Sequence, residues 1–204
     1  MEKNKKRMVL ALFIFLASFF LVSVSLGSET VTVLGNSVKS DPGNKKSIPV
    51  FNLPMPGSEQ GKSYLGLTGI GNFQIGQIKT HVLIIEVFSF YCPHCQIMAS
   101  QVNELYQKIQ ERPEMKEKIK IIGIGASNST YEVDFFKERY RVPFPLFPDQ
   151  SIEITQMLGV RGTPTFIGIK VNGNGTQERF YFREGGFEDT SQFLAEIIKL
   201  SGLK

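Results

Sequence analysis

The chain has 204 residues, and its 23 Lys and Arg exceed its 19 Asp and Glu, which gives a formal net charge of +4. Residues 1–27 carry four basic side chains and one acidic side chain, so they account for +3 of this charge and the remainder is near +1. Because the chain shows no basic stripe with interleaved aromatic residues, its charge does not indicate nucleic-acid binding.

The first 27 residues have the pattern of an export signal. A basic start precedes an uncharged stretch from Met8 to Leu26 that contains only three serines, which is typical of a signal peptide. About 20 apolar residues can also span a bilayer. We therefore expect residues 1–27 to be a signal peptide or a signal anchor, with the membrane contacted only through this segment if it is uncleaved. Because basic flanks stay in the cytoplasm, we expect the rest of the chain to be periplasmic or on the outer face of the cytoplasmic membrane.

After residue 27, the sequence predicts a linker and then one domain. Residues 28–56 are polar and rich in Ser, Asn, Gly, Pro and Lys, which predicts a flexible linker. Residues 57–204 have about the size of one domain. Within them, a nearly continuous apolar run over 82–90 predicts a strand buried on both faces, and apolar residues spaced by three and four over 92–112 predict a helix.

The rest of the domain continues this alternation. We expect strands over 118–125, 164–171 and 178–183, the last two as a hairpin, and helices over 129–140, 149–159 and 189–200. Ser129 and Glu132 have the spacing of a capping box, while three prolines in 142–148 predict a short extended piece at best. The expected architecture is α/β, with a mixed central sheet flanked by helices.

The most informative motif is Cys92-Pro93-His94-Cys95, which contains the only two cysteines of the chain. It lies where the predicted strand passes into the predicted helix, so Cys92 stands at a helix N-terminus. Unpaired N–H groups and the helix dipole favour a thiolate there, and a thiolate is the species that attacks disulfides. The motif therefore predicts a redox-active pair rather than a structural disulfide, whose small ring would add little stability.

Other uses of the motif fit the sequence less well. Structural zinc needs four ligands, and the two cysteines and two histidines have no zinc-finger spacing, while haem attachment needs His where Gln96 stands. Two alternatives stay open. Thiolates and a histidine suit Cu(I), although His81 precedes the strand and is expected at the far edge of the sheet. Ser89-x-x-Cys92 resembles the Thr-x-x-Cys of peroxiredoxins, which is the pattern of a thiol peroxidase.

Together with two further features, the motif resembles the thioredoxin superfamily. The loop over 160–165, with Thr163 before Pro164, looks like the cis-proline loop, and Glu86 stands six residues before Cys92, where the superfamily carries a buried acid. The run from Glu86 to Cys95 is very similar to the active-site strand of DsbA-type oxidases, whereas the spacing from Cys95 to Pro164 fits the TlpA/ResA group. The resemblance covers roughly residues 51–201 and implies a thioredoxin-like fold with one extra strand–helix insert before the cis-proline loop.

The resemblance and the local chemistry assign roles to four residues. Cys92 is expected to be the attacking nucleophile, favoured as a thiolate by the helix dipole and by His94 if that side chain is protonated. Cys95 is expected to be the resolving thiol. Glu86 lies in an apolar strand, where burial raises the pKa of a carboxyl group, so we expect it to exchange a proton with Cys95. The alternative is a solvated carboxylate at a sheet edge.

Further residues are expected at the substrate surface. A cis bond before Pro164 would leave the backbone of Thr163 free to pair with an extended substrate segment, with Pro93 also in contact, while a trans turn is the alternative. Phe90 and Tyr91 are expected either in the core or on an apolar rim that faces the substrate. Other aromatic residues at helical spacing are predicted to be core rather than a ligand site, namely Tyr131, Phe135, Phe136 and Tyr140.

These features predict an extracytoplasmic thiol–disulfide oxidoreductase that exchanges disulfides with protein thiols through Cys92 and Cys95. The direction stays open between a TlpA-like reductase and a DsbA-like oxidase or isomerase. We expect the partners to be protein thiols or disulfides and a redox partner protein, with no nucleic acid, no cofactor and no metal.

Overall fold

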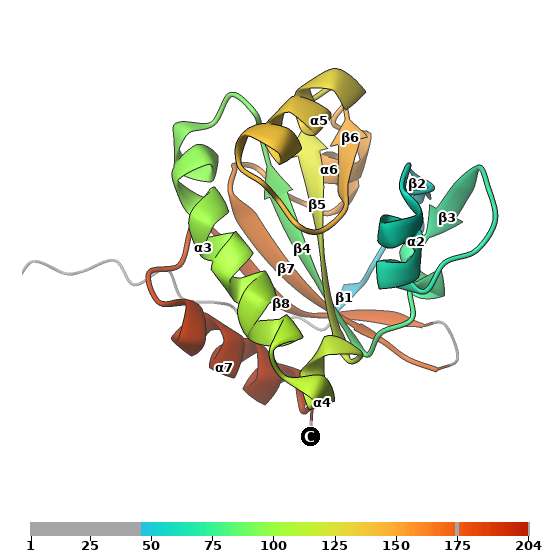
Figure 1. Cartoon of the computed structure of the whole chain (residues 1–204), viewed down its shortest axis with the longest axis vertical. Coiled ribbons are helices and arrows are strands. Elements are labelled where there is room, and N and C mark those ends of the chain that lie inside the picture. The colour runs from blue at the N-terminus through green and yellow to red at the C-terminus, as the bar shows by residue number, and fades with distance from the viewer. Residues whose placement is uncertain (1–45, 174–175, 204) are drawn as a thin grey trace, which may run out of the picture. The chain divides into compact units, whose positions relative to one another are not determined.

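The computed structural model describes residues 46–173 and 176–203. Their main sheet is mixed and has six strands in the order β1–β8–β7–β4–β5–β6 (Figure 1). β4 pairs parallel with β5 and β5 with β6, whereas β4–β7, β7–β8 and β1–β8 are antiparallel. The strands of this sheet are Lys46–Ser47 (β1), Val82–Phe88 (β4), Ile119–Ala126 (β5), Leu146–Asp149 (β6), Thr165–Val171 (β7) and Gln177–Glu184 (β8).

Helices lie against this sheet, and a separate antiparallel pair is formed by Asn52–Pro54 (β2) and Asn72–Gln74 (β3). The α-helices are Glu59–Leu65 (α2), Pro93–Gln110 (α3), Pro113–Lys116 (α4), Thr130–Arg139 (α5), Glu153–Met157 (α6) and Thr190–Ser201 (α7), and a 3₁₀ turn, η1, spans Ile75–Gln77. Figure 1 shows α3 and α7 along one side of the sheet and α2 with β2 and β3 on the other.

The middle of the sheet is buried on both faces. Every residue of β4 and β5 is buried, as expected for strands that are covered on both sides. Ile84 and Phe88 of β4 pack in one core with residues of α3, α5 and α7. Leu83 and Ile85 alternate with them and pack in a second core with residues of α2, β2 and β3. The side of the sheet that a β4 residue faces therefore decides which core it joins.

From residue 82 on, the predicted strands and helices follow one another in the predicted order, including the hairpin and the strand–helix insert before the cis-proline loop; α2 and α4 were not predicted. The capping box is present: Ser129 accepts a hydrogen bond from the Glu132 N–H, and the Glu132 carboxylate accepts one from the Ser129 N–H. Asp189 caps α7 in a similar way by accepting from the Gln192 N–H at 2.8 Å.

Two segments differ from the prediction. Residues 46–56 fall in the predicted linker, yet Phe51 and Leu53 are buried in the second core, so the folded residues begin before residue 57. Residues 142–148 contain most of β6, a true strand that pairs with β5. It lies at the edge of the sheet, where prolines are tolerated because one side of the strand has no ladder to complete.

The predicted signal segment 1–27 and most of the predicted linker lie outside the described residues. Within 46–173 and 176–203, no helix combines the length and the apolar character needed to cross a membrane.

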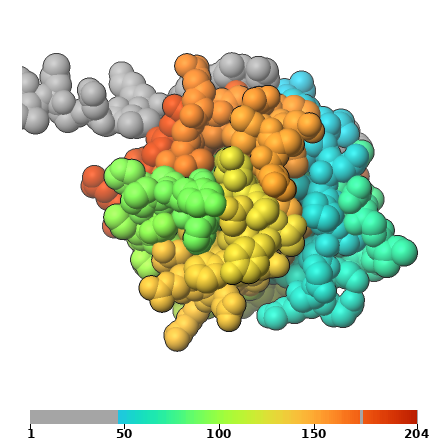
Figure 2. Space-filling model, turned by 90° about the horizontal axis from the view of Figure 1, so that it is seen from above, coloured from blue at the N-terminus to red at the C-terminus, as the bar shows by residue number. Residues whose placement is uncertain are grey.

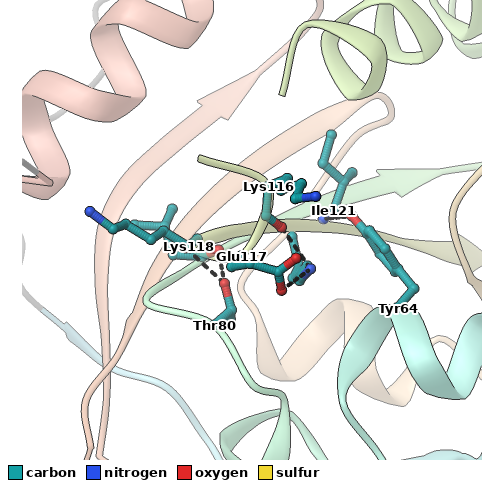
Figure 3. A network of polar contacts seen from close by, with 8 residues as sticks. Tyr64, Thr80, Lys116, Glu117, Lys118 and Ile121 are labelled. Atoms are coloured by element: carbon teal, nitrogen blue, oxygen red, sulfur yellow. Dashed lines mark hydrogen bonds and ion pairs between the residues drawn. The ribbon is translucent and has the colours of Figure 1, made fainter. Parts of the chain in front are cut away.

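A polar network anchors β5 near its start (Figure 3). The Ile121 N–H donates to the Tyr64 hydroxyl at 2.8 Å, which ties α2 to the sheet. Lys120 is buried, and its Nζ donates to the Lys116 carbonyl at 2.6 Å and lies 3.6 Å from a carboxylate oxygen of Glu117. The same Nζ lies 4.9 Å from the centre of the Tyr64 ring. This buried charge is thus surrounded by partners, as a buried ammonium requires.

Candidate active site

The two cysteines lie at the N-terminus of α3, as predicted. Cys92 is the N-cap residue, with extended backbone angles, and its sulfur accepts a hydrogen bond from the Cys95 N–H at 3.4 Å. Pro93 stands in the first turn of the helix, where its missing N–H leaves no bond unmade. Both cysteines are free thiols in this structure.

The two thiols differ in exposure and acidity. Cys92 is half-buried, and burial by itself raises its pKa. Hydrogen bonds with the Thr163 side chain, with the Cys95 thiol and with the N–H groups of Cys95 and His94 outweigh that effect, so the pKa of Cys92 lies below its ordinary value. Cys95 is fully buried, and burial raises its pKa far above the ordinary range. At neutral pH the outer thiol is therefore the better nucleophile.

The loop before β7 reaches the outer thiol from a distant part of the sequence. The Thr163–Pro164 peptide bond is cis, as predicted. The Cys92 thiol donates to the Thr163 carbonyl with 3.3 Å between sulfur and oxygen. Thr165 fixes the same loop by donating from its hydroxyl to the Gly162 carbonyl at 2.7 Å. The backbone of this loop thus lies directly against the Cys92 sulfur.

Glu86 lies within the sheet and not at its edge, so the alternative of a solvated carboxylate is wrong. It is 3% exposed in β4, which β5 and β7 flank on either side. Because side chains alternate along a strand, Glu86 points to the same side as Ile84 and Phe88 and so faces the core that contains Cys95. Burial raises the pKa of Glu86 to about 8. Its Oε1 has no hydrogen-bond partner among the described residues.

One histidine precedes β4, and the other follows it in α3. His94 is exposed beside Cys92 in the first turn of α3, while His81 directly precedes β4 and so lies at the other end of that strand from the cysteines. In the part of the chain that the structure describes, no three side chains from His, Cys, Asp and Glu gather as a metal site would need. The third ligand that the Cu(I) alternative requires is therefore not supplied by His81.

Two residues near the cysteines were not predicted from the sequence, Asn128 and Gln96. Asn128 is fully buried after β5, and its side-chain oxygen accepts from the Phe90 N–H at 2.8 Å, while its amide lies 3.5 Å from the Ser89 hydroxyl. Gln96 donates to the Phe90 carbonyl at 2.9 Å. Both backbone polar groups of Phe90, in the turn that delivers Cys92, are thus held by side chains. An Asn directly after an apolar strand, at the same sheet edge as the cysteines, was the available signal.

The aromatic residues around the site divide into core and rim. Phe90 is half-buried, whereas Tyr91 is 65% exposed, so Tyr91 belongs to the rim. The prediction that the aromatic residues of α5 are core is correct for Phe136 but wrong for Tyr131 and Phe135, which are 75% and 44% exposed. A helix packed on one side buries only one stripe of residues, and these two lie off that stripe.

Fold and site define a thiol–disulfide oxidoreductase with a thioredoxin-like fold. Two curated relatives named thiol-disulfide oxidoreductase ResA support this class: the Halalkalibacterium halodurans protein is 24% identical over 63% of this chain and 67% of its own length, and the Oceanobacillus iheyensis protein is 22% identical over 84% and 83%. The chain belongs to the AhpC/TSA family, which it matches over residues 45–183.

Solved structures agree on the fold. A putative thiol:disulfide interchange protein DsbE from Chlorobium tepidum superposes with a TM-score of 0.58 at 17% identity, covering 77% of this chain and 96% of that one. StoA from Bacillus subtilis superposes with a TM-score of 0.53 at 17% identity, covering 73% and 96%.

Proposed function

We propose that this chain exchanges disulfides with protein thiols outside the cytoplasm through Cys92 and Cys95. The observation that carries the proposal is the contrast between the thiols: Cys92 is accessible with a lowered pKa, and Cys95 is buried with a raised one. The basic and then uncharged pattern of residues 1–27, which is that of a signal peptide or a membrane anchor, supports the location.

The exchange runs in two steps. The Cys92 thiolate attacks one sulfur of a substrate disulfide, forms a mixed disulfide and releases the other substrate sulfur as a thiolate. Cys95 then loses its proton and attacks the Cys92 sulfur, which forms the Cys92–Cys95 disulfide and releases the second substrate thiolate. Two electrons pass to the substrate, and the reverse sequence oxidises a substrate dithiol. The redox partner of the chain sets the direction.

Glu86 is proposed to take the proton of Cys95 in the second step. It faces the core that contains Cys95, and its pKa of about 8 lets it exchange a proton near neutral pH. The unpartnered Oε1 leaves one carboxylate oxygen available for that proton. Glu86 is thus proposed as a general base for the resolving thiol, and as the acid in the reverse direction.

Thr163, Pro164 and Pro93 are proposed to bind the substrate backbone. The contact between the Cys92 thiol and the Thr163 carbonyl supports this role, because backbone of the loop lies beside the sulfur that is attacked. An extended substrate strand could add to that backbone, while Pro93 is the residue that directly follows Cys92. His94, exposed in the same turn, is proposed to raise the redox potential by stabilising the thiolate of the reduced form.

The proposal is tested by exchanging each thiol for serine. Cys92→Ser is expected to abolish insulin reduction with dithiothreitol, whereas Cys95→Ser, which keeps the nucleophile, is expected to accumulate mixed disulfides that survive non-reducing electrophoresis. If Cys95 reacts first with an alkylating reagent at mildly acidic pH, the assignment of the two thiols is reversed.

The two alternative functions have their own readouts. Stoichiometric Cu(I) binding without insulin reduction would favour the metallochaperone, and rapid consumption of hydrogen peroxide at Cys92 would favour the peroxidase. The equilibrium potential of the Cys92–Cys95 pair against glutathione then separates a reductase from an oxidase.

A further inference from the structure

We propose that an exposed aromatic patch beside the active site, made of Tyr91, Tyr131 and Phe135, binds an apolar and preferably aromatic side chain of the substrate polypeptide, a few residues from the cysteine that Cys92 attacks. The inference rests on the proposed disulfide exchange and extends it to the choice of substrate. It assigns to the start of α5 a role in selecting protein substrates.

The three rings belong to one continuous surface. Phe90 links them: its ring centre lies 5.0 Å from that of Tyr91 and 5.6 Å from that of Phe135, and Phe135 lies 6.4 Å from Tyr131. Single exposed apolar residues are ordinary on protein surfaces, whereas contiguous ones mark interaction sites. The patch begins at the residue directly before Cys92, so an extended chain of about five residues would cover it from the reactive sulfur outward.

The exposed rings of Tyr131 and Phe135 are not needed to pack α5 on the sheet. α5 packs on the sheet through Val133 and Phe136, which are both buried. Tyr131 and Phe135 are four residues apart and so share a different face of the helix. The α5 helix therefore carries a buried stripe that holds it in place and a separate aromatic stripe that is turned towards solvent.

The patch is held in place before any substrate arrives. The Tyr91 hydroxyl donates to Glu132 Oε1, and Glu132 Oε2 accepts from the N–H and the hydroxyl of Ser129 at 2.7 Å each. The capping carboxylate of α5 thus also ties down the residue next to Cys92. A ring that is already oriented loses less conformational entropy on binding, which favours a binding surface over a chance exposure.

The position of the patch beside Cys92 favours a substrate polypeptide as its ligand. Figure 2 looks onto this end of the domain, where the surfaces of the start of α3 (green) and the start of α5 (yellow) adjoin, with the chain before β7 (orange) beside them. A substrate bound to Cys92 as a mixed disulfide is tethered here, so its neighbouring residues are at a high effective concentration over the patch. The Glu132 carboxylate at the patch disfavours an anionic lipid surface.

The test compares peptides with a small disulfide. The reduced protein is mixed with two glutathionylated peptides that differ only in Phe or Ser three residues from the cysteine, and with glutathione disulfide, which is too small to span the patch. We expect the second-order rate constant to be about threefold to tenfold higher for the Phe peptide, as expected for one aromatic contact. Tyr131→Ser and Phe135→Ser should each reduce this preference while glutathione disulfide reacts at the wild-type rate.

The matched control is Ile70→Ser, which removes a side chain that is 92% exposed and lies in the loop before β3. It should leave the Phe preference intact. Equal rates for the two peptides with normal glutathione disulfide exchange would overturn the inference and leave the proposed function standing, whereas no exchange with glutathione disulfide would overturn the proposed function itself. If the patch variants instead dissociate a dimer in sedimentation experiments without changing the peptide preference, the patch is a self-association surface and the inference is wrong.

Discussion

Glu86 and Lys120 are two buried ionisable residues on neighbouring strands of the same sheet, and their surroundings are opposite. Lys120 has a carbonyl acceptor, a carboxylate and an aromatic ring within reach. Glu86 has an oxygen without a partner among the described residues and a pKa raised to about 8 by burial alone. A buried charge with partners supports a fold, whereas a buried acid without them is unstable as an anion and is free to exchange a proton. The start of β5 is therefore anchored by polar partners, whereas β4 carries a buried acid with an unpartnered oxygen near the cysteines.

The largest effect is expected on the free energy of unfolding when the carboxyl group of Glu86 is removed. Glu86 ionises near pH 4.5 in the unfolded chain and only near pH 8 in the folded protein. Between these values the unfolded chain has lost a proton that the folded protein keeps, so the free energy of unfolding falls as the pH rises. We expect Glu86→Gln to lack this loss of stability with rising pH. At pH 9 it should be more stable than wild type by a few kcal/mol, on the order expected for such a pKa shift. Urea unfolding of the reduced protein at pH 5, 7 and 9 measures the difference.

The control for this experiment is Glu117→Gln. Glu117 is an exposed carboxylate that pairs with Lys120, and its replacement should leave the pH dependence of stability as in wild type. Parallel slopes for wild type and Glu86→Gln would show that the pKa of Glu86 is the same in the folded and the unfolded protein, and would remove Glu86 from the proposed proton transfer.

The second prediction concerns the resolving step. Without a carboxylate to accept its proton, Cys95 should attack the mixed disulfide more slowly in Glu86→Gln, by about tenfold to a hundredfold at neutral pH, and the pH–rate profile should flatten. Rapid-quench analysis of the mixed disulfide with glutathione follows this step separately from the attack by Cys92, whose rate should not change. A Gln variant with the wild-type profile would make Glu86 a structural residue.

The third prediction compares the loss of one buried hydrogen bond near the cysteines with the loss of one at the start of β5. Asn128→Ala leaves the Phe90 N–H without its acceptor, and Tyr64→Phe leaves the Ile121 N–H without its acceptor. Each should cost about 1–3 kcal/mol of unfolding free energy, as for a buried group left unsatisfied. Only Asn128→Ala should also slow exchange with glutathione disulfide, because only Asn128 positions the turn that delivers Cys92. Equal exchange rates in both variants would contradict the positioning role.

The smallest effect is expected at His94, which is exposed. Replacement by Ala should lower the redox potential of the Cys92–Cys95 pair, because the thiolate of the reduced form loses a stabilising neighbour. The expected shift is about 30 mV for each tenfold change in the equilibrium constant with glutathione, and it is measured by redox titration. Lys62→Ala, which removes a basic side chain from α2, serves as the control and should not move the potential.

The active-site elements could be predicted because their signals are local. An apolar run followed by Cys92 and a helical pattern places the thiols at a helix N-terminus, and the Ser129–Glu132 spacing marks the start of α5. These signals depend on neighbours within a few residues, so they survive without knowledge of the fold. The cis-proline loop was also found, but through its resemblance to a superfamily and not from the chemistry of its residues.

What only the tertiary structure decided are contacts between residues far apart in the chain. Asn128 reaches Phe90, and Thr163 reaches Cys92, across 38 and 71 residues. Leu146–Asp149 becomes an edge strand despite its proline because β5 offers a ladder to it. Tyr131 and Phe135 resemble core residues in the sequence, since helical spacing shows which residues share a face but not which face the sheet covers. By itself the sequence determined that the two cysteines lie at a helix N-terminus. The packing of the sheet determined which buried acid, which loop and which aromatic rings surround them, because burial is a property of the assembled layers.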